Sequence, residues 1–133
     1  WYEQLHPQLK EKLDAFREEW GAPVEVSPVD GAVGRHGGSS RSRHNVDVWG
    51  SVQAVDVFPI GLVGHADAIR AVSLAKRVGF TGIGFYPHWR PQPGVHLDVR
   101  DDRPPGRPAT WGGIRPDGKA MKYVSLQEAV DAL

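Results

Sequence analysis

The sequence predicts one α+β domain in which a small, mainly antiparallel sheet is flanked by helices. Two observations predict this class: helical patterns occupy the middle and both ends of the chain, and short strand-like runs lie between them. A length of 133 residues suits a single domain, so we expect 1–133 to fold as one unit.

Three segments have helical patterns. The first carries an apolar stripe at spacings of three and four residues, with Pro7 in its first turn and Gly21 at its end. The second covers 65–79 and the third 125–133. The apolar stripe of the first helix consists of Leu5, Leu9, Leu13, Phe16 and Trp20. In the second helix, the residues expected to face inward are Ile69, Val72 and Ala75. In the third helix, Ser125 and Glu128 are expected to form a capping box.

Strand-like runs are rich in Val and aromatic residues and are bounded by Gly or Pro. The segment 28–45 is predicted to be a long loop of Gly, Ser, Arg and His, and a loop of that length is often functional. The segment 101–118 is predicted to be a proline-rich surface stretch. The predicted strands are 22–27, 52–58, 80–87 and 94–100, and the glycines of the third permit a bulge or a close approach.

The composition excludes several classes of function. The chain has 16 basic and 16 acidic residues, so its near-zero net charge offers no electrostatic footprint for nucleic acid or an anionic membrane. No apolar run approaches the ~20 residues of a membrane span. Cysteine is absent, so any metal must be held by His, Asp or Glu. We expect the protein to act as a monomer.

Asp56 is the first residue that calls for a chemical explanation, because it lies inside a strand-like run between Val55 and Val57. A lone ionised carboxylate there would lose much of its hydration. Such a residue caps a turn, pairs with an arginine or binds a metal ion. A metal-free domain in which an arginine neutralises Asp56 is therefore one interpretation.

The run 94–100 alternates strictly between apolar and polar residues, so the two faces of this strand differ. The apolar face is expected to point to the core. The other face carries an imidazole, a carboxylate and a guanidinium, a pattern also typical of a solvated surface with an Asp–Arg pair. The apolar residues are Val95, Leu97 and Val99, and the polar residues are His96, Asp98 and Arg100.

His44, Asp56 and His96 together supply nitrogen and oxygen ligands without sulfur. Three protein ligands plus a water are typical of catalytic zinc, whereas structural zinc has four protein ligands, often including Cys. A water on zinc ionises near neutral pH and can attack a carbonyl. These residues predict a Zn²⁺ site and metal-assisted hydrolysis.

Three short motifs resemble the metal signature of the M15 zinc peptidases. They are "SRH" at 42–44, "AVD" at 54–56 and "HLD" at 96–98, where the family has S-x-H-x-x-G-x-A-x-D followed by H-x-D or H-x-H. The approach "GFTGIGFYP" and Trp111 in "ATWG" look like the M15A-type branch. The resemblance covers roughly 24–112.

This resemblance implies a DD-peptidase/hedgehog-like fold and a zinc site made of His44, Asp56 and His96. It also implies that Ser42 braces the first ligand. The family contains D-Ala-D-Ala carboxypeptidases and endopeptidases that cut peptidoglycan stem peptides, including many phage endolysins.

The spacing of the first motif departs from the family. The family has six residues between the His and the Asp, whereas this chain has the eleven residues "NVDVWGSVQAV", in which Gly50 would stand for the motif glycine. The longer spacing fits if 45–51 loops out before the strand. It leaves His36, in the same loop, as an alternative to His44.

The catalytic base is less clearly marked. Some family members have an acid about three positions before the last histidine, and 92–94 supply none. Asp98 is the candidate base, because it lies on the His96 face of the strand. It could equally hold His96 or pair with Arg100. His88 is a second candidate acid or base.

Arg35 is the second candidate catalytic residue. It occupies the stretch where family members carry Ser-Gly-Tyr-Arg, although that context is missing here. It could bind a substrate carboxylate or stabilise an oxyanion, or be a solvated loop residue. Tyr86 and Trp89 are candidate walls of the cleft, and Tyr86 is equally expected in the core.

The function predicted from the resemblance is that of a zinc metallopeptidase acting on the peptide part of bacterial peptidoglycan. Endopeptidase and D-Ala-D-Ala carboxypeptidase activity both stay open. The expected partner is a stem peptide of the cell wall, reached in the periplasm or outside the cell, as a phage lysin would reach it. The alternative is a non-catalytic cell-wall-binding or phage structural domain that keeps zinc for stability, which the missing acid and the stretched motif favour.

Overall fold

The computed structural model describes all of residues 1–133 and confirms the predicted α+β class. No helix has the length and apolar character that crossing a membrane requires. The helices are α1 (Pro7–Trp20), α2 (Val46–Trp49), α3 (His65–Val78) and α4 (Leu126–Asp131), with 3₁₀ turns at Tyr2–Gln4 and Pro116–Gly118. The strands are β1 (Val24–Val26), β2 (Ala54–Pro59), β3 (Gly82–Tyr86), β4 (Gly94–Asp98), β5 (Ala109–Ile114) and β6 (Lys122–Val124).

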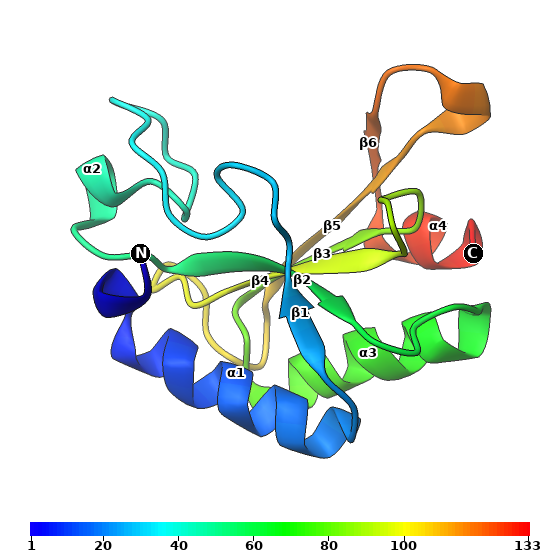
Figure 1. The fold of residues 1–133 in the computed structure, drawn as a ribbon, viewed down its shortest axis with the longest axis horizontal. Coiled ribbons are helices and arrows are strands. Elements are labelled where there is room, and N and C mark those ends of the chain that lie inside the picture. The colour runs from blue at the N-terminus through cyan, green and yellow to red at the C-terminus, as the bar shows by residue number, and fades with distance from the viewer.

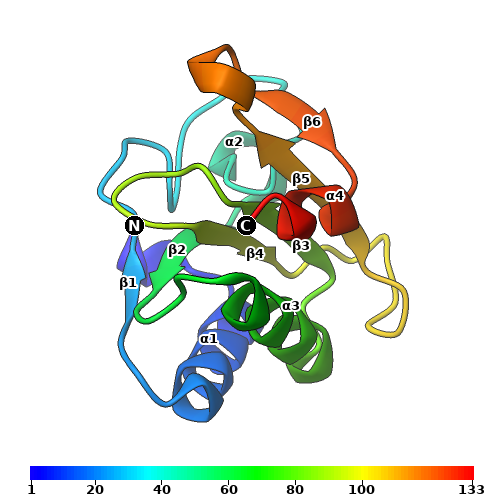
Figure 2. The ribbon, with the colours of Figure 1, turned by 90° about the vertical axis from the view of Figure 1, so that its right-hand side faces the viewer.

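All six strands form one sheet in the order β1-β2-β4-β3-β5-β6. Neighbouring strands are antiparallel except β3 and β5, which are parallel. Figure 1 shows the twisted sheet close to edge-on, and Figure 2 shows it turned by 90°. Strands β2 and β4, which carry two of the predicted ligands, are interior strands with a partner on each side.

The two faces of the sheet are covered differently. Helices α1 and α3 lie beneath one face, whereas the long loop after β1 and helix α2 lie over the other (Figure 1). Burial of each large apolar side chain on the helix face stabilises the fold by about 1.5–3 kcal/mol, so this face cannot carry polar chemistry. Its fully buried residues include Val55, Val57, Ile83, Phe85, Val95 and Leu97.

Helix α1 confirms the predicted apolar stripe. Leu9, Phe16 and Trp20 are buried, and Leu13 packs at the edge of the same core. Leu5 was predicted in the stripe but precedes the helix in extended backbone, where it forms a bridge with Val52 and packs on the same core. The helix begins at its proline and ends at a glycine with a φ of 79°, a left-handed conformation that glycine adopts at little cost.

Two details of the other helices differ from the predictions. Val72 and Ala75 are buried as predicted, whereas Ile69 was expected to face inward and is 47% exposed, because Ala68 takes the inward position in the first turns of α3. At the start of α4, Ser125 is the predicted N-cap and its Oγ accepts from the Glu128 N–H at 3.1 Å. The Glu128 carboxylate accepts from the Ser125 hydroxyl at 3.3 Å, which replaces the backbone contact of a full capping box.

The four predicted strands are all present, with ends within two residues of the predicted ones. The prediction for 101–118 is wrong in its second half, which forms β5, and β6 was not predicted at all. The sequence of β5, "ATWGGI", lacks the Val-rich alternation of a strand. Its extended form depends on pairing with β3 and on the close approach of Ala129 to Gly112, where a Cβ would have no room.

Candidate metal centre

Four strands contribute one transverse row of residues to the face opposite α1 and α3. Asp56 of β2 is paired with His96 of β4, His96 with Gly84 of β3, and Gly84 with Trp111 of β5. Residues in register across a sheet share a face. The row therefore brings Asp56 and His96 side by side without help from any loop.

Two glycines in β3 make room for this row. A Cβ at Gly84 would lie 2.6 Å from Trp111 Nε1, and a Cβ at Gly82 would overlap the Asp98 carboxylate. The glycines of this strand thus permit the close approach of neighbouring side chains, one of the two predicted explanations, and β3 has no bulge. Any side chain at these positions would displace the polar cluster.

His44 reaches the row from the long loop. The eleven residues between it and Asp56 include helix α2, which Asn45 caps and which Gly50 ends with a φ of 73°. The chain then returns, and Gln53 N–H donates to the Arg43 carbonyl at 3.1 Å. The extra residues therefore loop out before β2, as the sequence predicted, and His44 is kept next to the strand.

The three predicted ligands converge on one point. Asp56 Oδ1 lies 3.4 Å from His44 Nε2 and 3.1 Å from His96 Nδ1. The ligand atoms of all three residues lie within 4.8 Å of one another, and both histidines are buried. This group could hold a metal ion.

The chemistry of the donor set also fits a metal. The outer nitrogen of each histidine is engaged: His44 Nδ1 donates to the Val33 carbonyl at 2.7 Å, and His96 Nε2 donates to Asp98 Oδ2 at 2.7 Å. These bonds direct the other nitrogen of each ring toward Asp56, where it would be free to bind a metal ion once its own proton is released. Histidine ligands in metal sites are oriented in this way by acceptors on the far side of the ring.

The charges are consistent with a site built for a cation. Burial raises the pKa of Asp56, but hydrogen bonds from His44 and His96 outweigh it and hold this pKa at about 2. Burial disfavours the charged imidazole of His96, but the hydrogen bonds to Asp56 and Asp98 raise its pKa to about 9. In the metal-free protein a proton on His96 therefore balances the carboxylates, and a dication would replace that proton.

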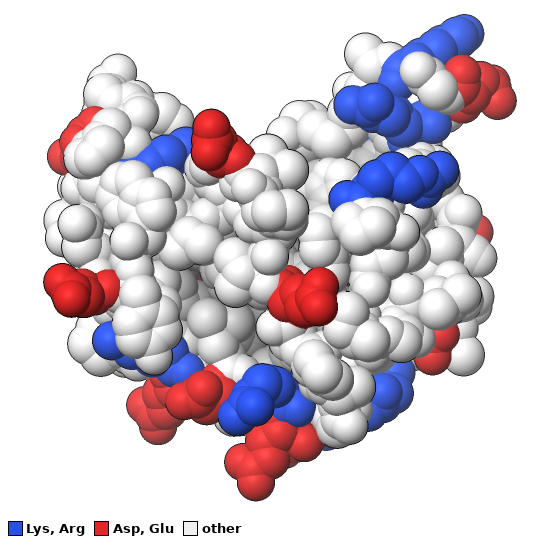
Figure 3. Space-filling view, viewed as in Figure 1, with Lys and Arg blue, Asp and Glu red and all other residues white.

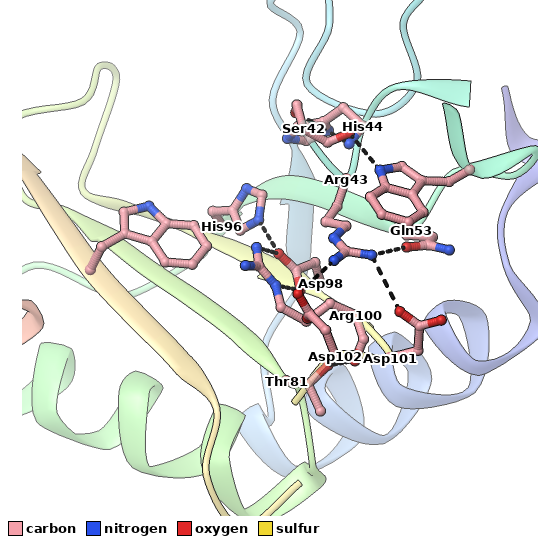
Figure 4. Close-up of polar contacts among 12 residues, drawn as sticks. Ser42, Arg43, His44, Gln53, Thr81, His96, Asp98, Arg100, Asp101 and Asp102 are labelled. Carbon is pink, nitrogen blue, oxygen red and sulfur yellow. Dashed lines mark hydrogen bonds and ion pairs between the residues drawn. The ribbon is translucent and has the colours of Figure 1, made fainter. Parts of the chain in front are cut away.

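Asp98 lies behind His96. It is completely buried, and its two oxygens accept from His96 Nε2, Arg100 Nε at 2.9 Å and Arg100 Nη2 at 2.6 Å (Figure 4). Burial raises the pKa of Asp98, but the bonds from Arg100 and His96 lower it to about 2. These bonds fit a carboxylate that orients His96. This role was the predicted alternative to that of catalytic base.

Arg43 is a part of the site that sequence reasoning missed. Its side chain is buried, stacks 3.7 Å from the Trp49 ring centroid and donates to Gln53 Oε1 at 3.2 Å. It also pairs with Asp101 and Asp102 at 3.6 and 3.2 Å (Figure 4). Arg43 thus ties the loop that carries His44 to the turn after β4. No local pattern marks it, because its partners are distant in sequence.

The other polar residues of the loop differ in whether they lie beside the candidate ligands or outside the ligand group. Arg35 lies beside the ligands, and its Nη2 donates to Ser42 Oγ at 2.7 Å. Ser42 therefore mainly holds Arg35, since its oxygen is 3.4 Å from the His44 N–H. His36 lies outside the ligand group, where its exposed ring bonds Asp47 at 2.8 Å. The structure thus brings His44, and not His36, to Asp56.

The aromatic residues line the space in front of the ligands. Tyr86 and Trp89 stack with ring centroids 4.0 Å apart, and Tyr86 Oη accepts from Trp111 Nε1 at 2.7 Å. The Trp111 ring lies 4.9 Å from the His96 ring. His88 Nδ1 accepts from the Arg115 N–H at 2.7 Å, so this histidine joins the turn after β3 to the end of β5.

Two cavities meet at the ligand group. The first, of about 650 Å³, contains all three ligands together with Arg35, Tyr86 and Trp111. The second, of about 350 Å³, contains Asp56, Phe58, His88 and Trp89. We call them the arginine cavity and the aromatic cavity. The candidate ligands are therefore accessible to a molecule larger than water.

Comparison of the chain with protein-family models, with curated proteins and with solved structures finds no match.

Proposed function

We propose that the chain is a zinc-dependent peptidase of the M15 kind that hydrolyses an amide bond in the peptide part of bacterial peptidoglycan. The observation that carries this proposal is the convergence of His44 Nε2, an Asp56 oxygen and His96 Nδ1 on the wall of an open cavity. Two nitrogens and one oxygen with an open side match zinc held by three protein ligands and a water. The substrate class comes from the motif resemblance at these same residues.

When bound, a zinc ion supplies Lewis-acid polarisation of the scissile carbonyl and a nucleophile from water at neutral pH. The protein contributes position and hydrogen-bond donors. Asp98 acts through His96, since it holds the imidazole in the tautomer and orientation that leave Nδ1 free. We therefore assign Asp98 a positioning role in place of the predicted role as base.

Two donors face the arginine cavity. One nitrogen of Arg35 is anchored on Ser42, which leaves its other N–H groups for a substrate carboxylate or a developing oxyanion. Tyr86 Oη accepts from Trp111, so its own proton can be donated to a substrate oxygen. Burial raises the pKa of Tyr86 to about 12, so the hydroxyl keeps that proton at neutral pH.

His88 is assigned the role of a hydrogen-bond donor to a substrate oxygen in the aromatic cavity. This ring lines the aromatic cavity together with Asp56. Because its Nδ1 accepts from the Arg115 N–H, the neutral ring carries its proton on Nε2. His88 was the second candidate acid or base in the sequence, but the lone pair of its neutral ring is engaged by the Arg115 N–H, so we assign it a hydrogen bond to the substrate and no proton transfer.

Digestion of purified peptidoglycan, followed by mass spectrometry of the released peptides, tests the proposal. The zinc-loaded protein is expected to cut a peptide bond, to lose activity with a chelator and to regain it with zinc. Arg35→Gln should lower kcat/KM by about 10²–10³-fold, the usual cost of losing an oxyanion donor, with zinc content unchanged. His36→Ala, which removes an imidazole outside the ligand group, is the matched control. Stoichiometric zinc without cleavage of any peptide bond would contradict peptidase activity.

One observation favours a second candidate, a non-catalytic domain that keeps zinc for stability and binds cell wall. Asp56 is the only carboxylate that lines either cavity, so no carboxylate outside the ligand group can act as a base. In this case zinc should raise the melting temperature, and the protein should co-sediment with peptidoglycan without cutting it. Peptide release by the parent protein would exclude this candidate.

A further inference from the structure

The ligand group does not sit at the closed end of a pocket. Asp56, Trp89 and Met121 line both cavities, so the arginine cavity and the aromatic cavity adjoin at the ligands. Figure 3 shows the molecule hollowed between the loop-bearing side and the side of β5 and β6. An extended chain laid across Asp56 would therefore have space on both sides of the reacting bond.

Charge in this two-sided cleft is strongly unbalanced. Six arginines line the two cavities, and Asp56 is the only acid. Two of the six are neutralised, since Arg43 pairs with Asp101 and Asp102, and Arg100 pairs with Asp98. The four arginines without an ion-pair partner are Arg35 and Arg41 in the arginine cavity, and Arg90 and Arg115 in the aromatic cavity.

The aromatic cavity combines a rigid apolar wall with its two cations. Trp89 is stacked on Tyr86 and meets Phe58 edge-on at 6.2 Å between centroids. The bond from Arg115 N–H to His88 Nδ1 holds the end of β5 against the turn that carries Arg90. A side chain with an aliphatic stem and a terminal carboxylate fits this combination, because the stem packs on the rings and the carboxylate meets the guanidinium groups.

We propose that the cleft binds an extended acidic peptide across the ligand group and cuts it internally, with Arg90 and Arg115 binding a side-chain carboxylate of the substrate in the aromatic cavity. This inference rests on the proposed function and extends it, since it selects endopeptidase over carboxypeptidase and adds a carboxylate subsite. Stem peptides that carry an acidic side chain have the chemistry that this subsite requires.

Kinetics on matched synthetic stem peptides test the inference. Each peptide carries a carboxamide at its C-terminus, and the pair differs only in a carboxylate or a carboxamide on one side chain. The zinc-loaded parent should cut both internally, with a KM about tenfold lower for the carboxylate peptide, as the loss of a charged hydrogen bond predicts. In Arg90→Gln/Arg115→Gln the two KM values should become equal, with kcat and zinc content unchanged.

Arg107→Gln is the control, because Arg107 is exposed and lines neither cavity. If the protein releases C-terminal residues, and does so only from peptides with a free C-terminal carboxylate, the proposal that it cuts internally is wrong. A carboxylate preference that survives in the double variant would overturn the subsite.

If the parent cuts neither peptide, peptidase activity is contradicted, and the subsite is then judged by calorimetric binding of the same pair. A roughly tenfold carboxylate preference that disappears in the double variant supports the subsite. Equal binding of both peptides by the parent overturns it.

Discussion

The candidate metal centre has two halves that are held in place by different means. Asp56 and His96 stand on interior strands, paired in register and surrounded by a hydrogen-bonded ladder. His44 stands on a loop without regular structure, and its position depends on the Val33 carbonyl and on the neighbouring Arg43. The strand half is thus positioned by the continuous hydrogen-bonded ladder of the sheet, and the loop half by a few single backbone bonds and by the side chain of Arg43.

We therefore expect substitutions in the strand half to abolish metal binding and substitutions in the loop half to weaken it. A strand holds its side chains in fixed positions, so no other residue can replace a metal ligand that is removed from it. A ligand on a loop can adjust, so weakening its supports should lower affinity without abolishing the site.

The largest effect is expected for Asp56→Ala. The change removes the only anionic ligand and leaves His44 and His96 without the carboxylate between them. Stoichiometric zinc binding, measured by elemental analysis after dialysis, should be lost. Retention of one zinc per chain in a folded Asp56→Ala protein would show that the ligand assignment is wrong.

The second effect concerns the strand half of the metal-free protein. Because the folded-state pKa of His96 is raised from 6.5 to about 9, its contribution to stability is complete below pH 6.5 and is lost as the pH rises through about 9. Asp56 and Asp98, with pKa values lowered from 3.8 to about 2, contribute fully above pH 3.8 and lose their contribution as the pH falls toward 2.

Urea unfolding of chelator-treated protein should therefore give its highest free energy between about pH 4 and 6.5. The decline toward pH 9 should be smaller in His96→Gln, which lacks the titrating imidazole. An unchanged decline in that variant would assign the alkaline loss of stability to another group.

A smaller effect is expected for Arg43→Met in the loop half. The variant keeps an apolar stem against Trp49 but loses the ion pairs to Asp101 and Asp102, so the segment before His44 becomes less constrained. Zinc affinity measured by competition with a chromophoric chelator should fall about tenfold, the lower end of the effect of groups behind a metal ligand. Arg41→Met is the matched control, because Arg41 also stacks over Trp49 but makes no ion pair. Equal affinities for the two variants would remove Arg43 from the site.

The smallest effect is expected for His36→Ala. His36 is an exposed loop histidine bonded to Asp47, and the ligand group does not include it. Zinc content and affinity should match those of the parent in the same measurements. A loss of zinc here would mean that the loop can present His36 in place of His44.

The sequence predicted much of the fold and the membership of the ligand group. The stripe of α1 and the alternation in β4 are local patterns with a direct physical meaning, so they indicated the core-facing residues correctly. Strand β5 was not predictable in this way, since its glycines and Trp111 serve contacts with β3 and α4. The buried roles of Asp98 and Arg43 depend equally on partners that only the folded chain supplies.

Residue type and the absence of cysteine limit the possible metal donors to nitrogen and oxygen, so the residues that could bind a cation are evident from the sequence. The sequence also indicates that one face of β4 is polar, because side chains alternate along a strand. Three further features are visible only in the folded chain. His44 rather than His36 meets Asp56, Asp98 is buried behind His96, and the cleft continues on both sides of the ligand group. These outcomes depend on strand register and on the path of a long loop, which arise from contacts between segments far apart in the chain.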